Sequence, residues 1–209
     1  MKEARTVKPA QAQHTRRSIR LKGHDYSQPG AYFVTVCTQD RACLFGEVAD
    51  GEMRLNPAGR LVERGWCAIP DHFPLARLDA FVVMPNHVHG IIVLSTVRAT
   101  HASPGATVGA THASPPRHPA PTGRPRGPQR HSIGAIVGSF KSAVTKNINA
   151  TRGTPGALVW QRNYYEHVVR DEGSLNRIRQ YILDNPAQWA MDRDNPLVVA
   201  AEEADAWRR

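Results

Sequence analysis

Two pairs of polar residues have spacings that would bring their side chains together, where they could do chemistry. His87 and His89 flank one valine in a run of strand-forming residues. Because successive side chains of a strand alternate between faces, both imidazoles would point the same way from Cα atoms ~6 to 7 Å apart, and one metal ion could bind both. The pattern fits two polar residues at a strand start equally well. The pair alone therefore does not decide between a metal site and a structural role.

The second pair, Tyr181 and Asn185, is four residues apart in a run of helical periodicity, so a phenol and an amide would share one helix face. A structural interpretation is again available. Tyr181 would place its ring in the core and its hydroxyl in water, and Asn185 would form a C-terminal turn. The sequence places the histidine pair on a hydrophobic strand and this helix downstream of it. The combination is more specific than either pair alone, and it favours a functional site.

Runs of β-branched and aromatic residues predict the strands that would carry the histidines and their neighbours. They span residues 31–38, 78–84 and 87–94, with a turn at Pro85-Asn86 between the last two. A short fourth candidate covers 158–160, and the chain then leads on to Val169.

Three helices are predicted from apolar periodicity. Asn56 caps the first, which ends at Pro70, and the second has its apolar face from Ile133 to Ile148. Ser174 is expected to cap the third, and Asn185-Pro186 to end or kink it, because the residue before a proline disfavours helical geometry. This order of elements predicts an α+β sandwich in which helices pack on an antiparallel sheet.

We expect one domain over residues 26–191, with three segments outside its fold. Residues 1–25 form a basic arm with seven Lys and Arg. Residues 97–130 form an insertion in which a Val-x-Ala-Thr-His-Ala-Ser-Pro pattern recurs after eleven residues, and its prolines and few large apolar residues predict disorder. Residues 192–209 form a tail of uncertain order.

The composition indicates a polyanionic partner and a reducing compartment. The 209 residues carry 27 Lys and Arg against 18 Asp and Glu, which gives a formal charge of +9. The three cysteines lack the paired spacing of zinc sites, so we interpret them as free thiols of a cytoplasmic protein. No apolar run is long enough to span a membrane, and none resembles a secretory signal.

Three ordered blocks resemble a known family. Met84–Ile92, which contains the His-Val-His run, resembles the His-hydrophobic-His strand of single-tyrosine HUH transposases. Trp160–His167 and Arg179–Pro186 resemble the two later blocks of the REP-associated branch. The resemblance extends from roughly Arg17 to Asn195, without the insertion. The sequence is thus similar to the REP-associated tyrosine transposases.

This resemblance implies a ferredoxin-like (RRM-like) sheet and a Mg²⁺ or Mn²⁺ ion held by His87 and His89. It also implies Tyr181 as the nucleophile and Asn185, one helical turn later, as the third ligand. Two imidazoles alone would favour zinc or another transition metal, so the choice of metal rests on the resemblance. The implied activity is cleavage and rejoining of single-stranded DNA through a 5'-phosphotyrosine. The implied partner is single-stranded or hairpin DNA of REP type, bound by a nucleoid-associated monomer or homodimer.

Tyr164 and Tyr165 compete for the nucleophile role, but their position on a strand or loop favours a structural or base-stacking role. Four basic residues could contact phosphates or lie in solvent: Lys141, Lys146, Arg162 and Arg170. Two other functions stay open. A domesticated DNA-binding protein is disfavoured by the intact His87, His89 and Tyr181. A His-based metallohydrolase is disfavoured because the sequence shows no carboxylate near the histidine pair.

Overall fold

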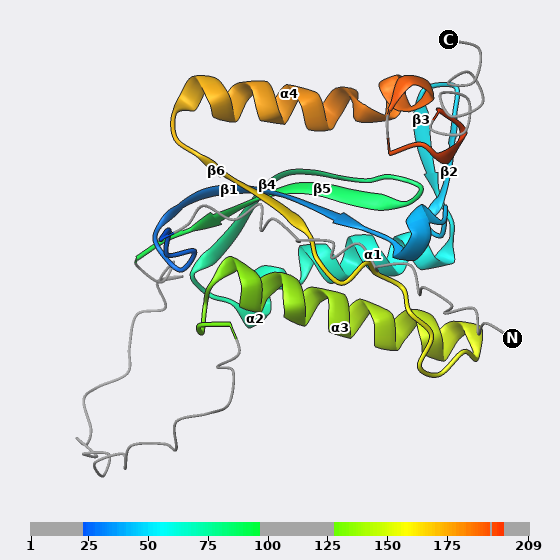
Figure 1. Ribbon diagram of the computed structural model, residues 1–209, viewed down its shortest axis with the longest axis horizontal. Helices are drawn as coiled ribbons and strands as arrows, with labels where there is room; N and C mark the ends of the chain where they lie inside the picture. The colour runs from blue at the N-terminus through cyan, green and yellow to red at the C-terminus, as the bar shows by residue number, and fades with distance from the viewer. Residues whose placement is uncertain (1–22, 97–127, 193, 199–209) are drawn as a thin grey trace, which may run out of the picture.

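A four-stranded antiparallel sheet forms the centre of the computed structural model, which describes residues 23–96, 128–192 and 194–198 (Figure 1). Its strands are β1 (Gly30–Cys37), β4 (Ala76–Val83), β5 (His87–Leu94) and β6 (Tyr165–Val169). They lie in the order β4-β5-β1-β6. The expected strands at 31–38, 78–84 and 87–94 are therefore confirmed as β1, β4 and β5.

Helices α1 (Pro57–Cys67) and α3 (Ile133–Arg152) connect β1 to β4 and β5 to β6, and both lie on one face of the sheet (Figure 1). Asn56 caps α1 by accepting a 2.9 Å hydrogen bond from the Gly59 backbone N–H. A β-α-β-β-α-β succession with this strand order is the ferredoxin-like arrangement, which confirms the predicted α+β fold class.

Side-chain alternation divides the sheet into two faces with different functions. Even-numbered residues of β1, such as Val34 and Val36, pack with buried residues of α1 and α3, including Trp66 and Phe140. The opposite face lies beneath α4 (Glu172–Gln188), where Phe33, Ile91 and Ile182 form a smaller apolar cluster. This second face carries the candidate chemistry.

A two-stranded hairpin, β2 (Gly46–Ala49) and β3 (Glu52–Leu55), was not predicted. Its turn is Asp50-Gly51, and both residues have positive φ, 57° and 76°. An Asp-Gly pair between two short strands is a strong hairpin signal, so this element was recognisable from the sequence. Three short helices complete the described fold: η1 (Gln39–Arg41), α2 (Ile69–His72) and η2 (Trp189–Met191).

The predicted start of the third helix was wrong. Asp171, not Ser174, is the N-cap of α4, since its Oδ1 accepts from the Ser174 backbone N–H at 2.7 Å. A carboxylate at the N-cap accepts a hydrogen bond from an otherwise unpaired backbone amide. Its negative charge also interacts favourably with the positive end of the helix dipole. The serine hydroxyl contributes a second bond to the same carboxylate, at 2.8 Å.

Of the two outcomes predicted at Asn185-Pro186, an end or a kink, the end of the helix was wrong. Asn185 keeps helical geometry, and α4 continues through Pro186 to Gln188. The proline lies in the last turn, where its missing N–H removes a single intrahelical bond, and the burial of Asn185 to 1% exposure holds the backbone in place. The short strand expected at 158–160 forms only an isolated bridge between Trp160 and Thr38, and Leu158 is exposed.

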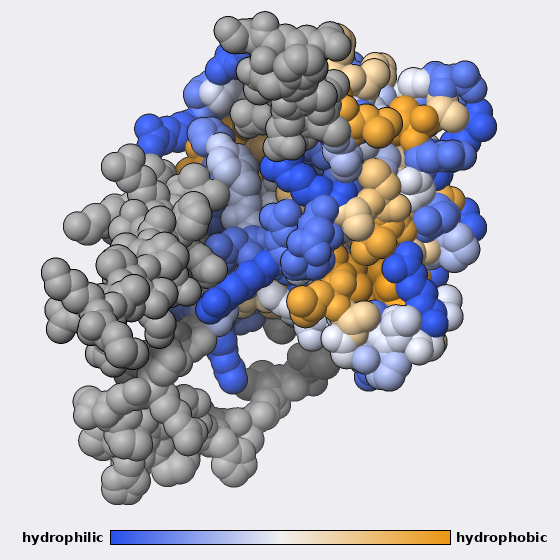
Figure 2. Space-filling view, turned by 45° about the vertical axis from the view of Figure 1, so that its right-hand side comes forward, coloured by the Kyte–Doolittle hydropathy of each residue, from blue (hydrophilic) through white to orange (hydrophobic). Residues whose placement is uncertain are grey.

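The expected arm, insertion and tail lie largely outside the described residues, which leave out 1–22, 97–127, 193 and 199–209. Within the described parts, no helix is long and apolar enough to cross a membrane. The surface drawn in Figure 2 has mixed polarity, with hydrophilic and hydrophobic side chains side by side. Among the exposed large apolar residues of the described chain are Tyr165 and Tyr181, each 42% exposed.

Candidate functional site

The two histidines of β5 point to the sheet face covered by α4, as strand alternation predicts. Their ring centroids are 4.4 Å apart. His87 is 0% exposed and His89 is 3% exposed, so neither imidazole is an ordinary solvated surface residue.

The protonation of His87 is fixed by its neighbour on the turn. Nδ1 lies 2.8 Å from Oδ1 of Asn86. The Asn86 amide nitrogen donates to the backbone carbonyls of Arg41 and Asp194, at 3.0 and 2.7 Å, so its oxygen must accept from His87. Nε2 of His87 is therefore the unprotonated nitrogen, and it is buried without a hydrogen-bond partner. An unpaired ring nitrogen of this kind is suited to bind a metal ion. In metal-binding histidines the other ring nitrogen is usually held by a hydrogen-bond partner, as Asn86 holds Nδ1 here.

His89 is held between the sheet and α4. Its Nδ1 lies 2.8 Å from Oγ1 of Thr35, its partner in the β1–β5 register. Its Nε2 lies 3.2 Å from the Tyr181 hydroxyl. With the ring proton on Nδ1, the hydroxyl would donate to Nε2, and both histidines would then present Nε2 as the atom with the lone pair.

Burial keeps both imidazoles neutral. It lowers the pKa of His89 well below its ordinary value, and the adjacent His87 lowers it further. Burial also lowers the pKa of His87, against the opposing influence of Asp194 and Asp192. Neutral imidazole is the form that coordinates metal ions.

Helix α4 brings Tyr181 and Asn185 to the histidines, on one helix face as predicted. The Asn185 side chain lies beside His87 and favours its protonated form, although Nε2 of His87 has no partner in hydrogen-bond geometry. Nδ2 of Asn185 donates to Oδ2 of Asp192 at 3.3 Å, whereas its Oδ1 is buried and unpaired. The amide oxygen is thus available as a further ligand atom.

An ion pair fixes α4 against the sheet two residues before Tyr181. Arg179 donates to both oxygens of Asp79, Nε to Oδ1 at 2.8 Å and an Nη atom to Oδ2 at 2.7 Å. The guanidinium lowers the pKa of the Asp79 carboxyl mainly through this hydrogen bonding. The irregular register between Leu78 and Phe81 in β4 places Asp79 at this contact.

The structure adds a carboxylate that sequence reasoning missed. Candidate ligand atoms of His87, His89 and Asp192 all lie within 4.8 Å of one another. Asp192 follows α4, more than a hundred residues after both histidines, and no spacing pattern connects it to them. The sequence argument that no carboxylate lies near the histidines was therefore wrong. Asp194, close by, forms a 3.1 Å ion pair with Arg41.

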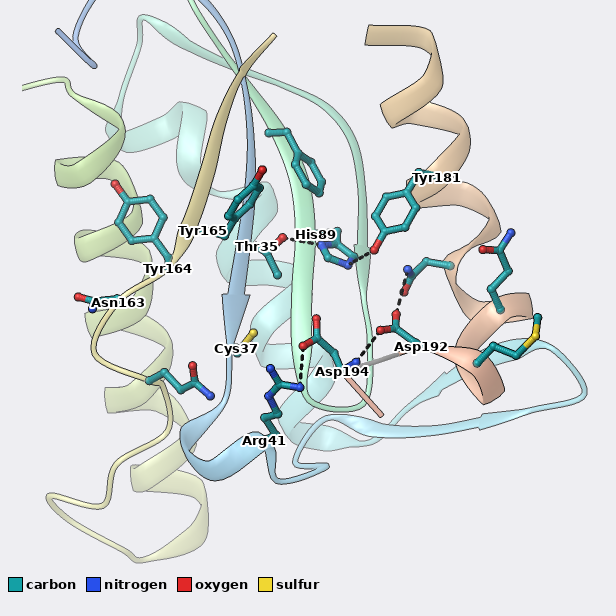
Figure 3. Close-up of a pocket in the computed structure, with 15 residues that line it drawn as sticks. Thr35, Cys37, Arg41, His89, Asn163, Tyr164, Tyr165, Tyr181, Asp192 and Asp194 are labelled. Carbon is teal, nitrogen blue, oxygen red and sulfur yellow. Dashed lines mark hydrogen bonds and ion pairs between the residues drawn. The ribbon is translucent and has the colours of Figure 1, made fainter. Parts of the chain in front are cut away.

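A cavity of about 910 Å³ lies between the sheet, α4 and the segment before β6 (Figure 3). His89, Tyr181, Asn185 and Asp192 are among the residues that line it. Tyr181 and His89 point toward each other across it, with Asp192 below them, and Tyr165 faces the same space from β6. Burial raises the pKa of the Cys37 thiol, also in the lining, to about 11, so this thiol is protonated at neutral pH.

The structure also places Tyr164, a candidate for base stacking, and Lys141, a candidate for phosphate contact. Tyr164 packs partly buried against the main core, and Figure 3 draws it on the other side of the segment from Tyr165. Lys141 donates to the backbone carbonyls of Gln161 and Arg162, at 2.5 and 3.2 Å, and so holds this segment to α3.

Comparison with known proteins gives one close sequence relative. An uncharacterised protein of Haemophilus influenzae is 40% identical over 181 residues, which cover 86% of this chain and 93% of the relative. The chain belongs to the family of this protein. No family model matches the sequence.

Two solved structures match this chain in structural comparison, each over 79% of the chain and at 17% identity. One is a REP-associated tyrosine transposase bound to a REP hairpin, of which 71% is covered at a TM-score of 0.49. The other is a candidate transposase of Deinococcus radiodurans R1, of which 97% is covered at a TM-score of 0.37.

Proposed function

We propose that this protein is a REP-associated tyrosine transposase that cuts and rejoins single-stranded DNA through a covalent bond to Tyr181. The observation that carries the proposal is the 3.2 Å approach of the Tyr181 hydroxyl to His89, beside the unpaired Nε2 of His87. A nucleophilic oxygen and metal-binding groups must meet at one phosphate for this chemistry. The proposed partner is hairpin-forming DNA in the cytoplasm, bound by a monomer or homodimer.

The side chains present fit a divalent cation. His87 and His89 would supply Nε2 atoms, and the Asp192 carboxylate and the Asn185 amide would supply oxygens. Oxygen donors suit Mg²⁺ and Mn²⁺ better than two imidazoles alone would. When bound, the ion would withdraw charge from a non-bridging phosphate oxygen and so favour attack at phosphorus.

Tyr181 supplies the nucleophile in the proposed reaction. A phenol is mostly protonated at neutral pH, so its proton must leave as the oxygen attacks. The new Oη–P bond forms as the bond from phosphorus to the 3' oxygen breaks, which leaves a 5'-phosphotyrosine and a free 3'-hydroxyl. One phosphate ester replaces another, so a second 3'-hydroxyl can reverse the step and join strands without ATP. The ion pair between Arg179 and Asp79 would hold α4, and therefore Tyr181, in place during attack.

A second function is favoured by one observation, the Asp192 carboxylate beside the histidine pair. Two histidines and an aspartate also suit a metallohydrolase, in which a metal-bound water would be the nucleophile. Tyr181 would then be dispensable. The two functions differ in whether a protein–DNA adduct forms.

The test is covalent capture of DNA. The wild type is incubated with Mn²⁺ and a single-stranded oligonucleotide that contains a hairpin, and adducts resistant to SDS are separated on a denaturing gel. We expect an adduct with the wild type and none with Tyr181→Phe, which loses only the nucleophilic oxygen. His87→Ala, His89→Ala or a chelator should abolish cleavage through loss of the metal.

Tyr164→Phe and Tyr165→Phe are the matched controls, because each removes one phenol oxygen elsewhere, and both should still form the adduct. A Tyr181→Phe protein that still becomes linked to DNA would contradict the proposal. Cleavage by the wild type without any adduct would favour the metallohydrolase.

A further inference from the structure

Tyr165 belongs to the lining of two cavities. It lines the 910 Å³ cavity that contains His89 and Tyr181, and it also lines a second cavity of about 350 Å³ with His167, Arg170 and other residues. Its side chain is 42% exposed, although it comes from a strand of the central sheet. Because Tyr165 lines both cavities, a chain molecule that occupied both could contact this side chain.

An aromatic row connects this ring to the proposed nucleophile. The centroid of Phe33 is 6.2 Å from that of Tyr165 and 6.2 Å from that of Tyr181, and 5.4 Å from that of His89. Phe33 is 9% exposed and supports the row from below, while the Tyr165 ring is the accessible member at its far end. The β1–β6 register fixes this position, because Tyr165 pairs with Thr35, the residue that holds His89.

Positive charges flank the strand that carries Tyr165. Arg162 precedes β6 and Arg170 follows it, and both side chains are exposed. A neutral aromatic surface between two cations matches a single nucleic-acid strand, whose bases stack on π-faces while its phosphates contact basic groups. Amides of Gln161 and Asn163 line the same cavity and could bond to base edges.

We propose that Tyr165 is the stacking platform for an unpaired DNA base next to the cleaved phosphate, and that the strand continues from the large cavity over Tyr165 toward Arg170. The assignment rests on the proposed DNA-cleaving function, and it specifies where the substrate lies. Duplex DNA does not fit this role, because its bases are stacked on one another and cannot cover the ring.

The test compares binding of two single strands of equal length and charge, measured by fluorescence anisotropy with chelator present so that no cleavage occurs. One strand is oligodeoxythymidine, and the other has abasic sites throughout. The wild type should prefer the strand with bases. Tyr165→Ala should reduce the ratio of the two affinities roughly 5- to 150-fold, the range measured for loss of one stacked base.

Three further variants separate stacking from other effects. Tyr165→Phe keeps the ring and should retain the wild-type ratio, whereas Tyr165→Leu keeps apolar volume without a π-face and should lose it. Leu183→Ala truncates an apolar side chain on α4 that is even more exposed, at 66%, and should change nothing. Thermal unfolding checks that every variant is folded.

The outcomes distinguish this inference from the proposed function. An unchanged affinity ratio in Tyr165→Ala, or a wild type that binds both strands equally, overturns the stacking site even if the covalent adduct forms with Mn²⁺. Conversely, the expected pattern of ratios without any adduct would retain the stacking site and reject the transposase chemistry.

Discussion

Tyr181 and His89 meet at one ring nitrogen: the tyrosine hydroxyl lies 3.2 Å from Nε2 of the imidazole. Nδ1 of His89 is already paired with Thr35 at 2.8 Å, so Nε2 is the ring atom left for a metal ion. A nitrogen with a single lone pair cannot accept this hydrogen bond and coordinate a cation at once. Metal binding would therefore release the Tyr181 hydroxyl from the imidazole.

This competition predicts that Tyr181→Phe binds metal more tightly than the wild type in the absence of DNA. Loss of a hydrogen bond worth about 0.5 to 1.5 kcal/mol should raise the Mn²⁺ affinity roughly 2- to 10-fold. Isothermal titration with Mn²⁺ measures the change, and Tyr164→Phe should bind as the wild type does. Weaker binding by Tyr181→Phe would mean that the phenol oxygen itself is a ligand.

The oxygen ligands can be tested in the same titration. Asp192→Asn should weaken Mn²⁺ binding at least about 10-fold, because a carboxylate beside the two imidazoles is lost. Asn185→Ala should weaken it by about 10- to 100-fold, whether the amide is a ligand or orients Asp192. Asp184→Asn removes the same charge from α4, where Asp184 bonds to Gln180, and serves as control. Wild-type affinity in Asp192→Asn would leave Asn185 as the third ligand.

The ion pair between Arg179 and Asp79 should matter for the rate of adduct formation. Arg179→Ala frees α4 from β4, and a displacement of the nucleophile by ~1 Å costs on the order of 10²-fold in rate. Asp79→Ala should give the same loss, and the double variant should be no slower than either single variant. Arg177→Ala, which removes an α4 arginine that donates to Ser174 of the same helix, should react nearly normally. Additive losses in the double variant would show that the two residues act separately.

The buried histidines predict how stability depends on pH. In the metal-free folded protein the pKa values of His87 and His89 lie below the ordinary 6.5, so the unfolded chain binds more protons below that pH. The free energy of unfolding should be constant above about pH 6.5 and fall below it, by at most about 1.4 kcal/mol per pH unit for each imidazole. Urea unfolding between pH 8 and 5 measures this slope. His89→Gln should flatten it, and an equally steep slope in that variant would locate the titration elsewhere.

Gly90, next to His89, supports the site by its lack of a side chain. A Cβ atom there would overlap the indole of Trp66, which is 0% exposed. Gly90→Ala should lower the free energy of unfolding by about 1 to 3 kcal/mol. Gly138→Ala in α3 meets no atom within 4 Å and should instead stabilise the protein by about 0.5 to 1 kcal/mol. Equal effects of the two substitutions in thermal unfolding would contradict this packing argument.

Much of the fold could be predicted from local periodicity in the sequence. Alternation along 87–94 was enough to put both histidines on one face, and helical spacing was enough to put Tyr181 and Asn185 together, because these relations depend only on backbone geometry within one element. The α+β class followed from the order of such elements. The Asp50-Gly51 hairpin was also encoded locally, although it was overlooked.

Other features depended on contacts between distant segments. The end of α4 could not be read from Asn185-Pro186, since burial of Asn185 against the site overrides the local preference before proline. Asp79 and Arg179 are a hundred residues apart, and no pattern in the sequence pairs them.

The geometry of the candidate site depends on the tertiary structure. The sequence named His87, His89, Tyr181 and Asn185, but it could not show that Tyr181 approaches His89 or that Asp192 joins the histidines. Those distances arise where α4 packs across the sheet and the chain after it turns back to β5. Short-range rules fix which way a side chain points, whereas only the packing of one element on another fixes what it meets.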